Sequence, residues 1–262
     1  MRVLLSRWSV LVLVTYGTAF SLLCLAQTKP LGLDEIVSRM EQARADEHGR
    51  AAGYIVTREY QLSAQGAPQP GSDVVAQVSF IPPASKDYVI VKTEGNERGT
   101  GIVRKILEHE TRMAGHADTR AITRMNYAFA LIGRESLDGH DCYVLQLTPL
   151  RDSVELVRGR AWVDADTFIV RRVEGTTAKS PSFWIRNLQV TVNYGNINGV
   201  WLETSTRAVA DVRFVGPHVL TARDLDVRSA SLSARSQSSL QTVNQRRGRR
   251  HPEANAAAWV PR

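Results

Sequence analysis

The sequence predicts a mainly antiparallel α+β fold, an unclosed half-barrel whose apolar concave face is covered by about two helices. Most segments after residue 53 alternate apolar and polar side chains with the period of two that half-buried strands require. The links between these segments are too short for crossover helices, which favours antiparallel neighbours. Two amphipathic helical segments interrupt the strands, and a long one-sided sheet must cover its apolar side.

The first 26 residues have the pattern of an export signal. A basic start precedes an apolar run, and small residues at its end favour cleavage before Gln27. The chain is therefore expected outside the cytoplasm, in the periplasm of a Gram-negative bacterium. The run is close to the ~18–20 residues that cross a bilayer, so an uncleaved segment would instead anchor the chain in the inner membrane. A lipoprotein signal is disfavoured because Leu23 precedes Cys24.

Residues 27–228 are expected to form one domain, followed by a disordered basic tail over residues 229–262. The formal charge of +7 is concentrated at the end of the chain, where residues 228–262 hold seven arginines against one acid. Residues 27–227 carry 24 basic and 25 acidic side chains, so no basic face for nucleic acid is predicted. The tail either stays solvated or contacts anionic membrane surfaces through Arg246, Arg247, Arg249 and Arg250.

Periodicity places one helix over Leu33–Glu47 and a second over Ile102–Met113. The apolar stripe of the second helix makes it a candidate lid, and its members are Ile102, Val103, Ile106 and Leu107. Residues 121–131 fit a strand and a helix equally well. The expected strands are 54–62, 74–80, 88–91 and 142–148, then a hairpin over 159–175, then 183–194, 200–215 and 219–227.

Motifs for catalysis or metal binding are absent from the sequence. The six histidines are scattered, and neither an HExxH motif, a paired-cysteine ligand set, a nucleophile elbow nor a phosphate loop occurs. Asp164 and Asp166 could form a carboxylate pair, but a hairpin turn explains them better. Cys142 is expected to be a small buried side chain on a strand. No enzyme activity, cofactor or metal is therefore predicted.

A set of apolar and aromatic strand residues forms the candidate ligand cavity. Each of them is by default a core residue, but a curled sheet of this width encloses more volume than two helices fill. Arg58 lies among them on a mostly apolar face, where it either pairs with an acid or contacts a polar headgroup. The cavity candidates are Tyr54, Val56, Tyr60, Val78, Phe80, Tyr88, Ile90, Trp162, Trp184, Val190, Val192 and Leu202.

Several short motifs resemble the LolA/LolB-like periplasmic lipoprotein-carrier superfamily, in particular the outer-membrane lipoprotein-sorting proteins. The resemblance implies an unclosed barrel with a helical lid and an apolar cavity for acyl chains. The basic tail and the absence of a lipidated cysteine depart from the carrier and the receptor of that superfamily. The motifs are Tyr54-x-Val-x-Arg-x-Tyr60, Phe80-Ile-Pro-Pro83, Gly139-x-x-Cys-Tyr-Val-Leu145, Gly159-Arg-Ala-Trp-Val-Asp164, Arg172-Val-Glu-Gly175 and Gly199-Val-Trp-Leu202.

Two functions follow as hypotheses from the pattern and the resemblance. The first is an envelope carrier that holds acyl chains of lipids or lipoproteins, in outer-membrane lipoprotein sorting or lipid trafficking. The second is an envelope sensor or regulatory module that uses the same fold to bind an inner- or outer-membrane protein partner. Retained lipid would favour the first, and a strong protein partner with little bound lipid would favour the second.

Overall fold

The computed structural model describes residues 31–49 and 52–229. The predicted signal over residues 1–26 and residues 230–262 of the predicted tail lie outside the described residues. The described part contains the helices α1 (Leu33–Gly49) and α2 (Glu97–Arg112) and the 3-10 helix η1 (Ala114–Thr119). Its strands are β1 (Tyr54–Ala64), β2 (Ser72–Ile81), β3 (Ser85–Gly95), β4 (Tyr127–Leu137), β5 (His140–Pro149), β6 (Val157–Asp164), β7 (Val170–Thr177), β8 (Ile185–Ile197), β9 (Val200–Val212) and β10 (Gly216–Ser229).

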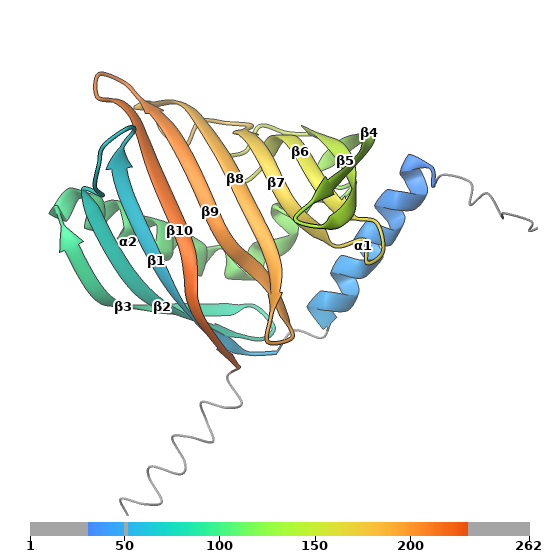
Figure 1. Cartoon of the computed structure of the whole chain (residues 1–262), viewed down its shortest axis with the longest axis horizontal. Helices are drawn as coiled ribbons and strands as arrows, with labels where there is room; N and C mark the ends of the chain where they lie inside the picture. Colours follow the sequence, from blue (N-terminus) through green and yellow to red (C-terminus); the bar gives the residue numbers. More distant parts are fainter. Residues whose placement is uncertain (1–30, 50–51, 230–262) are drawn as a thin grey trace, which may run out of the picture. The chain divides into compact units, whose positions relative to one another are not determined.

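The ten strands form one antiparallel sheet in the order β3-β2-β1-β10-β9-β8-β7-β6-β5-β4. Strands that follow one another in the sequence pair in the sheet, except β3 and β4, which lie at its opposite edges. The first strand, β1, pairs instead with the last strand, β10. Strands β3 and β4 are the free edges, so the curved sheet is not closed (Figure 1). The predicted unclosed half-barrel is confirmed.

The ambiguous segment 121–131 contains a turn followed by the start of β4 at Tyr127. Asn126 fixes the turn, because its buried side chain donates hydrogen bonds to the carbonyl oxygens of Asp118 (2.8 Å) and Ala121 (2.7 Å). A buried amide with both donors satisfied stabilises one backbone path. Of the two structures that the sequence allows for this segment, the strand is the one formed, and it begins only after Asn126.

Helix α2 begins at Glu97, earlier than its apolar stripe predicts, because Asn96 caps it. The Asn96 side chain accepts a hydrogen bond from the backbone nitrogen of Gly99 at 2.8 Å. Gly99 also allows the helix to approach β2 closely, since a Cβ atom there would lie 2.0 Å from Ser72 Oγ. This contact fixes the N-terminal end of α2 against the sheet.

Helix α2 defines the concave face of the sheet, since it packs against β2 and β3 on that side (Figure 1). Val103 and Leu107 of α2 are buried in one core cluster with side chains of β1 and β2, among them Tyr60 and Val74. A second cluster fills the concave face of β5 to β7, where Leu147, Ala161 and Val173 lie under Tyr127 and Leu156. The sheet thus has two filled flanks, one under α2 and one under the segments that precede β4 and β6.

Cross-strand register shows which side chains share the concave face between the two flanks. One row of directly paired residues crosses the sheet from β1 to β7. In strand order it consists of Tyr60 (β1), Ala222 (β10), Thr206 (β9), Val192 (β8) and Val173 (β7). Directly opposed residues point to the same face of a sheet. We name the apolar concave residues of the two middle strands the central strip, and they are Leu188, Val190, Val192, Ala208 and Ala210.

Aspartate 164 organises the turn between β6 and β7, as the turn hypothesis predicts. Its carboxylate accepts hydrogen bonds from the backbone nitrogens of Asp166 (3.1 Å) and Thr167 (2.9 Å) and from Arg171 Nε (2.5 Å). Burial opposes these contacts, but the hydrogen bonds to Thr167 and Arg171 prevail and lower the pKa of Asp164 to about 2. A carboxylate used in this way has a structural role.

Candidate ligand-binding site

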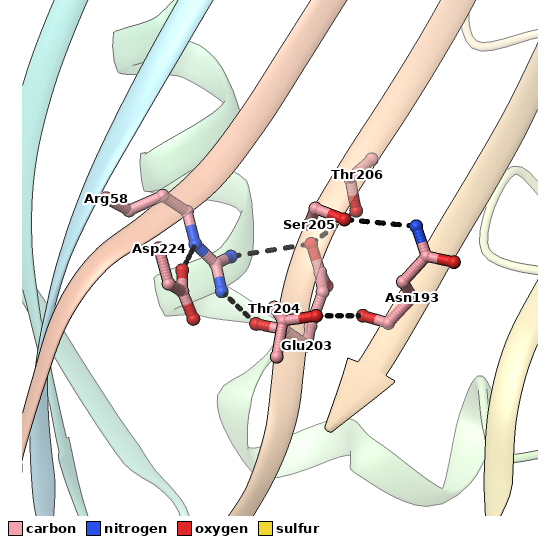
Figure 2. Close-up of polar contacts among 7 residues, drawn as sticks. All are labelled: Arg58, Asn193, Glu203, Thr204, Ser205, Thr206 and Asp224. Carbon is pink, nitrogen blue, oxygen red and sulfur yellow. Dashed lines mark hydrogen bonds and ion pairs between the residues drawn. The ribbon is translucent and has the colours of Figure 1, made fainter. Parts of the chain in front are cut away.

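A buried arginine lies where β1, β10 and β9 meet on the concave face. A register shift between Thr57 and Arg58 places Arg58 opposite Asp224. Arg58 Nε donates to Asp224 Oδ1 at 2.6 Å, and Nη2 donates to the carbonyl oxygen of Glu203 at 2.7 Å (Figure 2). The Arg58 and Asp224 side chains are only 8% and 2% exposed. Of the two roles open to Arg58, the structure therefore shows the pairing with an acid.

The acids around Arg58 keep its guanidinium charged. Burial alone would lower the pKa of Arg58, but the charge of Glu203 and the hydrogen bond to Asp224 raise it well above its usual value. Arg58 Nη1 also lies 3.4 Å from Glu203 Oε1. A buried ion of this kind is stable only with its partners in place.

Glutamate 203 is held by a polar network on β8 and β9 (Figure 2). Thr206 Oγ1 donates to its carboxylate at 2.5 Å. Next to it, Thr204 Oγ1 donates to the carbonyl oxygen of Asn193 at 3.2 Å, and Asn193 Nδ2 donates to Ser205 Oγ at 3.0 Å. The register of the two strands shifts between Asn193 and Tyr194. The network therefore secures an irregular part of the sheet and fixes the acid that faces Arg58.

Two buried polar atoms beside Arg58 lack a hydrogen-bond partner among the described residues, namely Asp224 Oδ2 and Tyr60 Oη. Burial and the charge of Glu110 raise the pKa of Tyr60, so its hydroxyl stays protonated and can donate. Unsatisfied buried polar groups are rare in folded proteins, and each requires a partner such as a water molecule or a ligand atom. An acceptor and a donor are thus both available at this point of the concave face.

Two further charged groups face the same region from β3 and α2. Lys86 lies opposite Phe80 in the sheet, and Glu110 lies in the last turns of α2. Within residues 31–49 and 52–229 neither side chain forms an ion pair or a hydrogen bond. Burial lowers the pKa of Lys86, which Glu110 partly offsets, while burial and Glu203 raise the pKa of Glu110. The two half-buried opposite charges therefore act on each other electrostatically without forming a hydrogen bond or an ion pair.

Sequence reasoning missed Lys86 and Glu110 because single charges at the ends of amphipathic segments usually face solvent. The strongest available signal was the spacing of Lys86 from Tyr88 and Ile90, which places all three on one face of a strand. The groups gathered around Arg58 contain no histidine or cysteine. The arrangement can bind a polar headgroup that carries both charges, or one that donates and accepts hydrogen bonds.

A pocket of about 490 Å³ opens at one end of the concave face. Tyr54 and Phe80 form one wall, with their ring centroids 5.3 Å apart. Trp201 forms another, while Arg44 and His48 of α1 supply polar groups. Its volume is within the range of about 300–1,000 Å³ typical of small-molecule sites. Two predicted cavity residues thus line a pocket.

Most of the predicted cavity residues lie on the concave face. Val56, Tyr60, Val78 and Leu202 are buried in the core cluster under α2, and the remaining concave ones are half-buried. Register places on this face Tyr54, Val56, Tyr60, Val78, Phe80, Tyr88, Ile90, Val190 and Val192.

Trp162 and Trp184 are placed elsewhere, and this corrects their inclusion in a concave cavity. Trp162 alternates with the concave residue Ala161 and packs on the convex side in a cluster with Cys142 and Val144. Its indole nitrogen donates to Glu135 at 2.9 Å. Trp184 is 59% exposed in the link before β8.

Cys142 is buried and free, as expected for a small core side chain.

The predicted lid stripe of α2 contributes mainly to the core. Val103 and Leu107 are fully buried against the sheet, whereas Ile106 is half-buried and Ile102 is 46% exposed. Tight packing at Val103 and Leu107 makes α2 part of the flank. A lid role for α2 and α1 stays a prediction.

No helix in the described ranges is both long and apolar enough to span a membrane. The same ranges contain no cluster of three or more side chains suited to hold a metal ion. The described fold and site define a class of protein: an open antiparallel half-barrel with helix-packed flanks and a charged, incompletely covered concave face.

Comparisons with known proteins return one family model and several solved structures. A family model described as "Uncharacterized protein" matches residues 86–213. A LolA superfamily protein from Nitrosomonas europaea is 17% identical with a TM-score of 0.34, covering 76% of this chain and 94% of its own. An outer membrane lipoprotein-sorting protein domain from Vibrio parahaemolyticus is 14% identical with a TM-score of 0.37, covering 72% and 91%.

A DUF1329 family protein from Desulfovibrio piger is also similar, at 14% identity and a TM-score of 0.38, covering 74% of this chain and 93% of its own. No curated protein matches the sequence.

Proposed function

We propose that the protein is an envelope carrier that binds an amphiphile, with an acyl chain along the central strip and a polar headgroup near Arg58, Lys86 and Glu110. The observation that carries the proposal is the half-burial of the central strip between two filled flanks. Apolar side chains on the inner side of a curved sheet are normally covered by the protein's own core. A bound acyl chain would supply the missing cover.

The energetics favour such a ligand. Each methylene removed from water contributes about 0.8 kcal/mol, so a long chain supplies ample gross affinity. The headgroup end is specified by the unpaired charges of Lys86 and Glu110 and by the unsatisfied atoms of Tyr60 and Asp224. Lipids and the acyl chains of lipoproteins both combine these features.

The test fills the central strip and compares the result with a matched change on the other face. Ala208→Trp places a large ring on the central strip, while Arg207→Trp places the same ring on the convex side one residue away. We expect Ala208→Trp to weaken binding of a fluorescent fatty acid about tenfold or more and Arg207→Trp to leave it unchanged. Native mass spectrometry of the exported wild type should show bound lipid.

The headgroup region has its own matched pair. Lys86→Met removes the half-buried cation, and Lys92→Met removes an exposed one on the same strand. Weaker binding of an anionic or zwitterionic amphiphile is expected only for Lys86→Met. Absence of bound lipid together with no fatty-acid binding by the wild type would refute the carrier proposal.

The second candidate is an envelope sensor that binds a protein partner, and the open sheet edges favour it. β3 and β4 each leave one side of their backbone unpaired in the sheet. Exposed apolar residues accompany both edges, with Val89 and Ile132 61% and 53% exposed. An exposed edge strand can accept an added strand from a partner. Cross-linking from β3 to one envelope protein, without bound lipid, would favour this candidate.

A further inference from the structure

Four large apolar side chains at one end of the sheet are strongly exposed. They are Phe183 (73%), Trp184 (59%), Phe214 (89%) and Val215 (67%). Phe183 and Trp184 belong to the link between β7 and β8, and the other two belong to the link between β9 and β10. We name this group the aromatic tip. Contiguous exposed apolar groups of this kind mark interaction sites.

Direct contacts join the two links of the aromatic tip. The Trp184 ring lies edge-on to Phe183 with centroids 5.7 Å apart and to Phe214 with centroids 6.4 Å apart. The backbone nitrogen of Arg213 donates to the carbonyl oxygen of Trp184, and Arg213 Nε donates to that of Phe183, both at 2.8 Å. The Arg213 guanidinium lies 4.7 Å above the Phe183 ring. The exposed rings are therefore held in place before any partner binds.

Phenylalanine 214 has a strained backbone conformation, and no burial of its side chain offsets that strain. Its φ of 66° lies in the left-handed region, which a non-glycine residue with a bulky side chain adopts only under strain. Its ring is almost fully exposed, so burial within the chain does not compensate. Strained residues of this kind concentrate at functional positions. Neither burial nor backbone preference within the described residues therefore accounts for a phenylalanine at position 214.

The charges beside the aromatic tip specify what it contacts. Residues 178–187 and 211–217 carry the basic side chains of Lys179, Arg186 and Arg213 and the single acid Asp211. Tryptophan and phenylalanine next to basic residues are the composition of segments that sit at the bilayer interface, where basic groups meet anionic headgroups. We propose that the aromatic tip docks the protein onto the surface of an anionic bilayer.

Docking would orient the ligand site. The central strip ends at Leu188 and Ala210, on the same two strands that carry the aromatic tip. A bilayer contacting Trp184 and Phe214 therefore lies at this end of the central strip. The pocket lined by Tyr54 and Phe80 lies at the other end of the sheet, away from the bilayer. The docking surface stands on its own exposure, strain and charge, and it does not depend on what the central strip binds.

The test measures binding of the full-length exported protein to vesicles of phosphatidylethanolamine and phosphatidylglycerol, with phosphatidylcholine vesicles for comparison. The variant combines Phe183→Ser, Trp184→Ser and Phe214→Ser. We expect a loss of binding of about tenfold or more, because three interfacial rings are removed. The control combines Ile81→Ser and Leu225→Ser, which remove exposed apolar residues away from the tip and should leave binding unchanged.

A single variant separates docking from folding. Phe214→Gly relieves the left-handed backbone, so its thermal unfolding midpoint should rise while its vesicle binding falls. A merely damaged fold would lower both. The same measurements with the four clustered tail arginines, Arg246, Arg247, Arg249 and Arg250, replaced by serine test the contribution of this basic cluster.

Vesicle binding by the triple serine variant equal to that of the wild type would overturn the proposal, as would binding that depends on the tail alone. Unchanged vesicle binding combined with loss of a cross-link to an envelope protein would assign the tip to a protein partner and would also overturn it. Ala208→Trp should dock normally, so failure of the carrier function and failure of docking give different results.

Discussion

The flanks and the centre of the sheet differ in how their concave side is covered. On the flanks, Val74 of β2 and Val163 of β6 are fully buried. In the centre, Val190 and Val192 remain partly exposed although they belong to the same sheet face. The flanks are covered by α2 and by the segments that precede β4 and β6, whereas the centre has no such cover among the described residues. The flanks form the packed scaffold, and the centre is only partly covered.

The charges follow the same division. Asp164 on a flank is fully engaged in a turn, and its pKa is lowered by its hydrogen bonds despite burial. Glu110 faces the centre without a hydrogen bond or ion pair among the described residues, and burial raises its pKa. Flank charges thus stabilise the fold, whereas charges that face the centre cost stability in the free protein. This is the pattern expected of a binding site.

The largest effect is expected at Arg58, the residue that joins the α2 flank to the centre. Arg58→Ala leaves Asp224 buried without its cation, which should cost about 3–5 kcal/mol in the free energy of unfolding. Arg223→Ala is the control, since Arg223 pairs with Glu59 at an exposed position of the same two strands. Denaturant unfolding that gives equal losses for both variants would contradict the buried pair.

A matched pair of valine substitutions tests the comparison itself. Val163→Ala removes two methyl groups from a fully buried flank position and should cost about 2 kcal/mol, including the cavity that remains. Val190→Ala makes the same change on the central strip, where the side chain is half-exposed, and should cost about half as much or less. Val190→Ala should instead weaken fatty-acid binding. Equal stability losses would mean that the centre is packed like the flanks.

Asp164→Asn tests whether an ionised flank carboxylate stabilises the folded state. The folded-state pKa is lowered, so the stability from Asp164 is present above its usual pKa of 3.8 and is lost as the pH falls towards about 2. The shift corresponds to about 2 kcal/mol, which solvent screening at the hairpin reduces to about 1 kcal/mol. The wild type should exceed the variant in unfolding free energy at neutral pH, and the gap should close in acid. A gap independent of pH would contradict this.

Glu110→Gln should change the free energy of unfolding in the opposite direction to Asp164→Asn, and by a smaller amount. The folded-state pKa is raised, so the ionised side chain disfavours the folded state, and the cost appears as the pH rises from 4.5 through the folded pKa. The variant should gain stability relative to the wild type over that interval. Lys86→Met should move the interval to higher pH, because Lys86 lowers the pKa of Glu110. An interval that does not move would show that the two groups are not coupled.

Local pattern was sufficient to predict much of the fold. Alternation located the strands, and the short links predicted their antiparallel order, because both depend on near neighbours in sequence. The face of Trp162 could not be predicted, since Ala161, Trp162 and Val163 are all buried and a bulge lies between the last two. Alternation carries no information where both faces of a strand are covered.

The charged part of the site was harder to predict because it depends on distant pairings. Arg58 was recognised as unusual from its apolar neighbours, but its partner Asp224 lies 166 residues away. Lys86 and Glu110 meet only because α2 lies across the sheet, which no local spacing specifies. The shift between Thr57 and Arg58 is likewise a property of the paired strands.

The pairing of β1 with β10 also constrains how the chain reaches its native state. The first strand can be completed only by the last, so an incomplete chain holds β1 to β3 with one edge open. Contacts between such distant segments form slowly, since a long loop must close first. The sheet is therefore completed only when the final strand is available and supplies Asp224, the acid that pairs with Arg58.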